Sequence, residues 1–182
     1  MTLRNWKEKI YVFLKKTHLD NHILWILYKT YIPLYNFIKH RDVYFFRSVA
    51  IEISTYCNRT CYYCPNVLEE TPVDFMTEET FNKIIDQLKE IDFSGSILYH
   101  FYNEPLLDKR LPSFIRHVKK NLPNCVSRIV SNGDFLSVDL ADDLIDAGIL
   151  DISITIHDID GKKFLNELEP VLKKYPEQIH IN

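Results

Sequence analysis

Glycine-rich phosphate loops and a sequence-wide excess of basic residues are both missing from this sequence, although a local basic patch stays open. The 182-residue chain has only four glycines, which excludes loops of the Walker or dinucleotide-binding kind. Its 22 Lys and Arg face 25 Asp and Glu, for a formal net charge of -3. Proteins that bind nucleic acid usually carry a basic patch or a basic excess. No nucleic-acid partner is therefore expected.

Long apolar segments are also absent. The uncharged run His22–Tyr28 is far shorter than the roughly 20 residues that cross a bilayer, and its extension to Ile38 brings in Lys29 and Pro33. Residues 1–9 carry charges, and no apolar leader segment follows them. We therefore predict no transmembrane span and a cytoplasmic location. The 46% hydrophobic content is enough for the core of one sizeable domain.

Residues 1–47 are predicted to form an amphipathic helical extension. The apolar residues Trp6, Ile10, Phe13 and Leu14 recur at helical spacing. Two interpretations stay open. The helices pack on the domain that follows, or residues 1–38 make peripheral contact with a membrane, for which Trp, Tyr and Lys beside aliphatic residues are suited.

From residue 48 onward, β-rich runs alternate with helical patterns. Thr77 is expected to cap the first helix, Pro112 to lie in the first turn of the second, and Gly148 to end the third. Pro170 is expected to kink or shorten the fourth helix. This alternation predicts an α/β fold with a parallel sheet and right-handed crossovers. The β-rich runs are residues 49–54, 96–102, 126–131, 151–156 and 178–181.

Polar clusters follow the first four runs. In parallel α/β folds, open or closed, functional residues lie at the carboxyl ends of the strands. We therefore expect these clusters to meet at one edge of the sheet. They are the cysteines 57, 61 and 64, then Asn103-Glu104-Pro105, Asn132-Gly133-Asp134 and His157-Asp158.

Three of the four cysteines, Cys57, Cys61 and Cys64, fall within eight residues. Such close spacing does not resemble a disulfide framework, and in a reducing compartment it favours a metal site. A structural zinc ion takes four ligands, and no fourth Cys or His lies nearby. Three thiolates on a cubane would instead leave one iron open. A zinc module that recruits a ligand such as His100 stays as an alternative.

Other Cys and His residues have structural interpretations. Cys125, at the start of a strand, is expected to be a buried thiol rather than a fourth cluster ligand. His100, within the second β-rich run, is expected to pack in the core. His157, beside Asp158, is compatible both with a structural role and with lining a substrate cavity.

The motifs resemble those of the radical S-adenosylmethionine (radical SAM) superfamily. Its C-x3-C-x-Φ-C signature, with Φ aromatic, is matched by Cys57, Cys61, Tyr63 and Cys64, just after a β-rich run. Residues 102–105 stand where the family has Gly-Gly-Glu-Pro, and residues 131–133 where many members have Thr-Asn-Gly. The resemblance covers about three-quarters of the chain, from residue 48 onward, and the wording of the cysteine motif is similar to that of SPASM/Twitch-like members.

The resemblance implies a partial parallel (β/α) barrel of about five strand–helix units over residues 48–182, with a [4Fe–4S] cluster and S-adenosylmethionine (SAM) as cofactors. The three cysteines of the motif would hold the cluster, and the iron without a cysteine would chelate SAM. Glu104 would accept a hydrogen bond from the methionine ammonium. The other residues implied in SAM binding are Tyr63, Ser131, Asn132 and Thr155.

The implied activity is reductive cleavage of SAM to a 5′-deoxyadenosyl radical, which abstracts a hydrogen atom from a metabolite, sugar or peptide. A reducing electron-donor protein would be the partner. The alternative is a non-catalytic, cluster-binding remnant or a subunit that needs another chain.

Two departures from the family pattern stand out. Tyr102 and Asn103 replace the two glycines before Glu104, so the backbone there is less free to approach the methionine, although the Asn103 side chain offers a compensating hydrogen bond. The family core has six strand–helix units and the sequence ends at the fifth, so a truncated C-terminus is expected.

Overall fold

The computed structural model describes residues 21–40, 46–68, 72–156 and 161–181. The chain divides into two compact units, Met1–Phe45 and Phe46–Asn182. The described part of the first unit is one helix, α2 (Asn21–His40), with Pro33 inside it. The helix predicted around residues 6–14 lies outside the described residues. Throughout the described ranges, every helix is too short or too polar to cross a bilayer.

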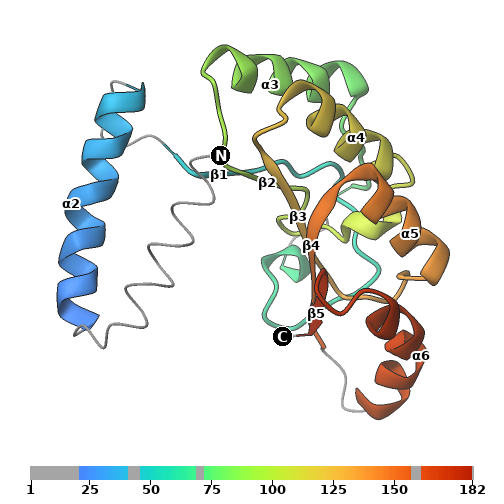
Figure 1. Ribbon diagram of the computed structural model, residues 1–182. Helices are drawn as coiled ribbons and strands as arrows, with labels where there is room; N and C mark the ends of the chain where they lie inside the picture. Colours follow the sequence, from blue (N-terminus) through green and yellow to red (C-terminus); the bar gives the residue numbers. More distant parts are fainter. Residues whose placement is uncertain (1–20, 41–45, 69–71, 157–160, 182) are drawn as a thin grey trace. The chain divides into compact units, whose positions relative to one another are not determined.

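The second unit is built on one sheet of five parallel strands in sequence order. Each strand pairs with the next one along the chain. Because parallel crossovers are right-handed, strands added in one direction place the connecting helices on the same face, as Figure 1 shows. The strands are β1 (Ser48–Ala50), β2 (Ser96–Leu98), β3 (Val126–Ser131), β4 (Ile149–Ile154) and β5 (Ile179–Ile181).

The helices lie between the strands, as the sequence pattern predicts. They are α3 (Glu78–Glu90), α4 (Leu111–Asn121), α5 (Val138–Ala147) and α6 (Gly161–Lys174), with short 3-10 turns η1 (Pro65–Val67) and η2 (Pro105–Leu107). This arrangement confirms the predicted α/β partial barrel. Its core packs sheet residues such as Ile97 and Ile129 against helix residues, among them Phe81 and Phe114, whose stacked rings have centroids 4.1 Å apart.

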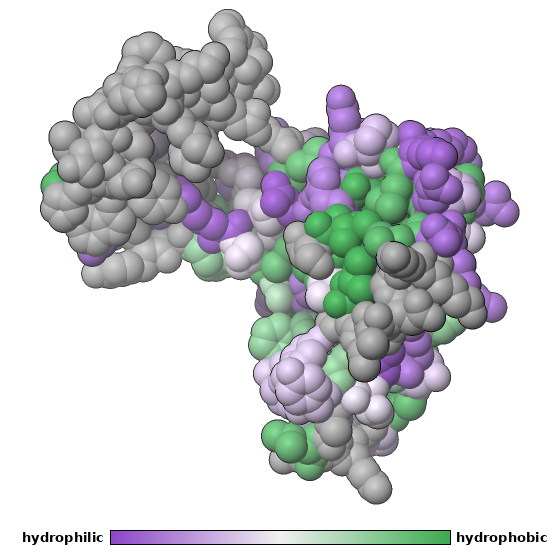
Figure 2. All heavy atoms as spheres, turned by 90° about the horizontal axis from the view of Figure 1, so that it is seen from below, coloured by the Kyte–Doolittle hydropathy of each residue, from purple (hydrophilic) through white to green (hydrophobic). Residues whose placement is uncertain are grey.

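Burial alternates along the strands and divides the sheet into two faces. In β3, Ser127, Ile129 and Ser131 are buried, whereas Arg128 and Val130 are exposed. Alternate residues of a strand point to opposite faces, so one face packs on the helices and the other is more open. Figure 2 shows hydrophobic side chains (green) at the surface of this unit between hydrophilic ones (purple).

The sequence predicts β1 and β2 longer than they are. Instead of extending to residue 54, the first run leaves the sheet after Ala50, and Ser54 forms an antiparallel bridge with Phe75. The backbone of Ile53 likewise accepts a hydrogen bond from Met76 N–H at 2.9 Å. Residues 53–54 therefore pair with segment 72–76 instead of with β2. Conversely, β4 begins two residues earlier than predicted, at Ile149.

Three predicted helix boundaries are confirmed, and of the two effects expected of Pro170, a kink or a shorter helix, the shortening is not found. Thr77 caps α3 by accepting a hydrogen bond from Thr80 N–H at 3.1 Å, Pro112 lies in the first turn of α4, and Gly148 follows α5 with φ +103°. Pro170 does not shorten α6, which continues to Lys174. Leu168 and Val171 are buried on either side of it, and their packing maintains the helix despite the missing N–H.

Gly148→Ala is expected to lower the free energy of unfolding by about 1–2 kcal/mol, because a residue with a Cβ is strained at this left-handed backbone angle. The new methyl group would also meet the Lys119 side chain, Cδ lying 2.5 Å away. Urea unfolding of the cofactor-free chain measures the change. Asp146→Ala, on the exposed surface of the same helix, is the control and should be near neutral. Equal stabilities for Gly148→Ala and wild type would show that the angle is not enforced.

Candidate cofactor site

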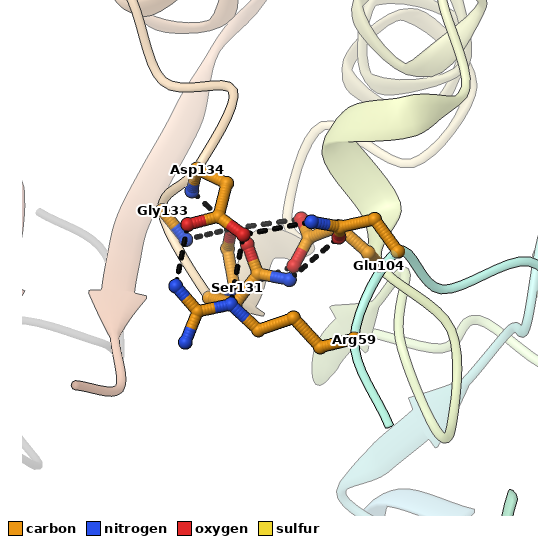
Figure 3. A network of polar contacts seen from close by, with 7 residues as sticks. Arg59, Glu104, Ser131, Gly133 and Asp134 are labelled. Carbon is orange, nitrogen blue, oxygen red and sulfur yellow. Dashed lines mark hydrogen bonds and ion pairs between the residues drawn. The ribbon is translucent and has the colours of Figure 1, made fainter. Parts of the chain in front are cut away.

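Glu104 is a buried carboxylate that joins the ends of two strands. Its side chain, which follows β2, accepts hydrogen bonds from Ser131 Oγ at 2.8 Å and Leu106 N–H at 3.0 Å through Oε1, and from Asn132 N–H at 2.8 Å through Oε2. Only 2% of the residue is exposed. Figure 3 shows the carboxylate facing Ser131 at the end of β3. These three donors fix its position.

The surroundings of Glu104 are unfavourable to its negative charge. Burial raises the pKa of Glu104, and the three donated hydrogen bonds oppose that rise. Asp134 adds a smaller effect in the raising direction. Within the described ranges, no Lys, Arg or His forms an ion pair with Glu104. A buried anion of this kind is suited to a cationic group of a ligand.

The cysteine motif lies directly beside Glu104. Glu104 N–H donates to the carbonyl of Tyr56, the residue before Cys57, at 2.9 Å. All three motif thiols, Cys57, Cys61 and Cys64, are half-buried and free of disulfides. Burial raises the pKa of Cys57, and the charges of Glu104 and the other two thiols raise it further. The three sulfurs and the carboxylate therefore lie within electrostatic reach of one another.

The start of the cysteine loop is held by the segment that returns after it. Thr55 Oγ1 donates to the carbonyl of Pro72 at 2.7 Å and accepts from Asp74 N–H at 2.9 Å. Thr55 N–H also donates to the Asp74 carbonyl at 3.0 Å. The residue before it, Ser54, has a buried hydroxyl without a hydrogen-bond partner in the described part of the chain. These contacts accompany the early end of β1 at Ala50.

A second set of contacts holds the middle of the loop, and sequence reasoning missed it. Arg59 Nε donates to Asp134 Oδ2 at 2.7 Å, and Nη2 contacts Oδ1. Asn58 Nδ2 donates to the same carboxylate at 2.7 Å, while Asn58 Oδ1 accepts from Asn132 Nδ2 at 2.8 Å. The available signal was the polar pair Asn58 and Arg59 between the first two cysteines, but nothing in it identifies Asp134 as the partner.

The other predicted ligand-binding residues lie at the same edge. Thr155, just after β4, donates its N–H to the carbonyl of Ser131 at 3.0 Å, so the ends of β3 and β4 are adjacent. Tyr63 is 56% exposed, and its ring contacts Tyr62 edge-on at a centroid distance of 5.1 Å. His157 and Asp158 lie outside the described residues.

The Asn103 side chain forms hydrogen bonds within its own loop. Its Oδ1 accepts from Phe101 N–H at 3.1 Å, and its Nδ2 donates to the Tyr99 carbonyl at 3.4 Å. The next backbone N–H, that of Tyr102, donates to Glu52 Oε1 at 2.8 Å. The residues that replace the family's two glycines thus build a fixed turn before Glu104. The Asn103 side chain makes its hydrogen bonds within this turn, and its compensation for the missing glycines stays a prediction.

Cys125 and His100 are not gathered with the three motif thiols. Cys125 Sγ contacts the Phe93 carbonyl at 3.2 Å, at the amino ends of β2 and β3 and therefore opposite the motif. It is half-buried rather than buried. His100 is also only half-buried, and its Nδ1 accepts a hydrogen bond from Val130 N–H at 3.0 Å.

The described residues do not form a single-ion site. No three of their Cys, His, Asp or Glu side chains are arranged to hold one metal ion, whereas zinc requires sulfurs that converge about 2.3 Å from one point. In an iron–sulfur cubane each thiolate binds a different iron. The donor set of three thiols on one short loop therefore fits a cluster better than the zinc alternative with His100.

His100 makes stability depend on pH. Burial lowers its pKa, so the unfolded chain binds the proton more readily. The contribution of neutral His100 to the free energy of unfolding should therefore be fully present above about pH 6.5, the usual pKa of His. This contribution should be lost as the pH decreases toward the lower pKa of the folded state. Urea unfolding of the cofactor-free chain between pH 5 and 7.5 measures this loss. His100→Asn keeps an acceptor for Val130 N–H but does not titrate, so it should not show this loss of stability at low pH. The same dependence of stability on pH in His100→Asn and wild type would contradict the expectation.

The comparisons with known proteins identify the family and agree with the observed fold. The family model described as the Radical SAM superfamily matches residues 51–179. The chain belongs to the radical SAM superfamily. The match begins in the segment that carries the cysteine motif and ends within β5.

Individual relatives agree with this assignment. The S-adenosyl-L-methionine-dependent 2-deoxy-scyllo-inosamine dehydrogenase of Niallia circulans is 36% identical over 113 residues, which are 62% of this chain and 45% of the relative. The PqqA peptide cyclase of Granulibacter bethesdensis is 31% identical over 113 residues, 60% of this chain and 28% of that protein. The chain thus matches less than half the length of either relative.

A solved structure gives the same result. The crystal structure of BtrN in complex with AdoMet and 2-DOIA superimposes with a TM-score of 0.69 at 31% identity, covering 75% of this chain and 56% of that chain. A [4Fe–4S] cluster and SAM are the cofactors of the superfamily, which confirms the predicted cofactors. The half-buried thiols and the buried carboxylate of this radical SAM chain fit them.

Proposed function

We propose that this chain is a radical SAM enzyme that binds a [4Fe–4S] cluster and SAM. The observation that supports it is the placement of Glu104, a buried carboxylate hydrogen-bonded to the end of β3 and, through its N–H, to the residue before Cys57. This placement puts an anion for a ligand ammonium beside three thiols for iron. The proposed barrel unit, residues 48–182, contains all of these groups. A helical extension over residues 1–47 and contact with a membrane through residues 1–38 stay predictions.

Cys57, Cys61 and Cys64 are proposed as the ligands of the [4Fe–4S] cluster. They come from one loop held at its start by Thr55 and in its middle by Arg59. Being half-buried, they combine access for iron with partial exclusion of water. The three thiolates would leave one iron without a protein ligand.

Glu104 is proposed to accept a hydrogen bond from the amino group of SAM. A charge-assisted contact of this kind is shorter and stronger than a neutral one, and the fixed carboxylate does not need to reorganise. Ser131 acts mainly through Glu104, since its hydroxyl donates to that carboxylate. Asn132 and Thr155 are proposed to contact the rest of SAM at the same edge, and Tyr63 to contact the adenine from the rim of the loop.

When bound, the cluster and SAM supply a 5′-deoxyadenosyl radical that removes a hydrogen atom from the substrate. The protein's part is to bind, orient and keep water away. An external reducing protein in the cytoplasm is proposed as the electron donor. Similarity to the Niallia circulans dehydrogenase and to BtrN favours a small hydroxylated metabolite or sugar as substrate over a peptide.

Formation of 5′-deoxyadenosine tests this function. The full chain is reconstituted with iron and sulfide under anaerobic conditions, reduced with dithionite and given SAM, and the nucleoside products are quantified. A radical SAM enzyme should release 5′-deoxyadenosine and methionine. A reconstituted cluster without any cleavage would instead support the alternative, a remnant or a subunit that needs another chain.

A further inference from the structure

We propose that Arg59 and Asp134 are positioning residues that hold the cysteine loop in the conformation that receives the cluster. This inference rests on the proposed function, because it assigns a role to residues around the same site. Arg59 lies between Cys57 and Cys61, and Asp134 lies in the loop after β3, 75 residues further along the chain. Figure 3 shows the guanidinium and the carboxylate facing one another across the two loops.

The environment of this ion pair differs from that of the helix surface. The side chains of Arg59 and Asp134 are 15% and 25% exposed, whereas those of Arg116 and Asp143, paired between α4 and α5, are 51% and 48% exposed. Exposed pairs contribute little because solvent screens them. Because solvent screens the Arg59–Asp134 pair less than the Arg116–Asp143 pair, its ion pair should hold the cysteine loop against Asp134 more firmly.

The contacts form a closed network. The Asp134 carboxylate accepts from both Arg59 and Asn58, and Asp134 N–H donates to Asn132 Oδ1 at 3.0 Å. Asn132 Nδ2 returns to Asn58 Oδ1. Two adjacent residues of the cysteine loop are therefore fixed to two residues of the β3–α5 loop. A two-pronged arginine contact also fixes orientation, which a lysine does not.

The network reaches a cluster ligand through the backbone. The backbone N–H of Arg59 faces the Cys57 thiol and opposes the rise that burial causes in the pKa of that thiol. The residue whose guanidinium is fixed by Asp134 therefore also presents an N–H to a proposed ligand. Hydrogen bonds to the ligand sulfurs are among the factors that set the properties of iron–sulfur clusters, so a change at Asp134 should reach the cluster without any change of its ligands.

The test compares cluster retention and electronic structure in reconstituted full-length chains. The variants are Asp134→Asn, Arg59→Gln and Arg59→Lys, and Arg116→Gln is the matched control on the exposed pair. We expect Asp134→Asn and Arg59→Gln to lose the cluster to an iron chelator about 10- to 100-fold faster than wild type, the usual effect of residues behind metal ligands. Their reduced clusters should also give altered EPR spectra. Arg59→Lys should be intermediate, and Arg116→Gln should match wild type.

The outcomes distinguish a role in positioning the cysteine loop from a general effect on folding. They also distinguish failure of this inference from failure of the proposed function. Thermal unfolding of the cofactor-free variants measures any general loss of stability. If another variant does not fold, Arg59→Lys, which keeps the positive charge, is used to measure cluster retention in its place. Retention and EPR spectra like those of wild type in Asp134→Asn and Arg59→Gln would overturn the inference and leave the proposed function intact. A wild-type chain that takes up no cluster would overturn both.

Discussion

Replacing Cys57, Cys61 or Cys64 with serine is expected to remove the iron–sulfur cluster and to reduce SAM cleavage at least about 100-fold. A serine hydroxyl does not ionise near neutral pH and is a poor iron ligand, whereas even residues behind the ligands commonly change metal affinity about 10- to 100-fold. Iron and acid-labile sulfide per chain, together with 5′-deoxyadenosine released, measure the effect.

Cys125→Ser is the control for this series. Cys125 contacts the Phe93 carbonyl at the amino ends of the strands, away from the motif, so the variant should keep its cluster and its cleavage activity. A full cluster in any of the three motif variants, or its loss in Cys125→Ser alone, would show that the ligands are wrongly assigned.

Glu104→Gln is expected to weaken SAM binding about 10- to 100-fold while the cluster is retained. Charged hydrogen bonds contribute about 1.5–3 kcal/mol, and each 1.4 kcal/mol is about a tenfold change in affinity. The amide would also turn its NH2 group toward the backbone N–H of Asn132, which now donates to the carboxylate. Titration of the reconstituted protein with SAM measures the affinity for SAM, and its iron content measures the cluster, so the effects on the two cofactors are told apart. Asp142→Asn, on the helix surface with its partner Lys174, is the control.

Binding of SAM should also depend on the protonation of Glu104. Burial raises the pKa of this carboxyl, so it takes up a proton at a higher pH than an ordinary glutamate. Wild-type affinity should therefore decrease as the pH falls through the raised pKa, and Glu104→Gln should lack this decrease. If Glu104→Gln binds SAM as tightly as wild type does, Glu104 does not contact SAM. If Glu104→Gln loses the cluster, Glu104 takes part in binding iron.

Local sequence signals predict the architecture well because they act within a few residues. Thr77 and Gly148 mark helix ends through side-chain capping and backbone conformation, which neighbouring residues determine. The cysteine spacing and the position of Glu104 after a β-rich run predict the candidate site through the resemblance to the radical SAM superfamily. With the strands in sequence order, the handedness of the crossovers places the connecting helices on one face of the sheet.

What the sequence does not predict depends on contacts between distant segments. The pairing of Arg59 with Asp134 spans 75 residues, and neither residue has a local signature. The early end of β1 results from the return of segment 72–76 to Ser54 and Thr55, and the uninterrupted α6 at Pro170 results from burial of its neighbours. In each case tertiary packing outweighs local preference.

The iron that no cysteine binds is the feature on which the assignment depends, and EPR spectroscopy of the reduced, reconstituted chain examines it without requiring turnover. We expect the spectrum of a reduced [4Fe–4S] cluster, held by Cys57, Cys61 and Cys64, that changes when SAM is added because SAM becomes a ligand of the open iron. A cluster spectrum that SAM leaves unchanged, or a chain that binds zinc in place of iron, would contradict it.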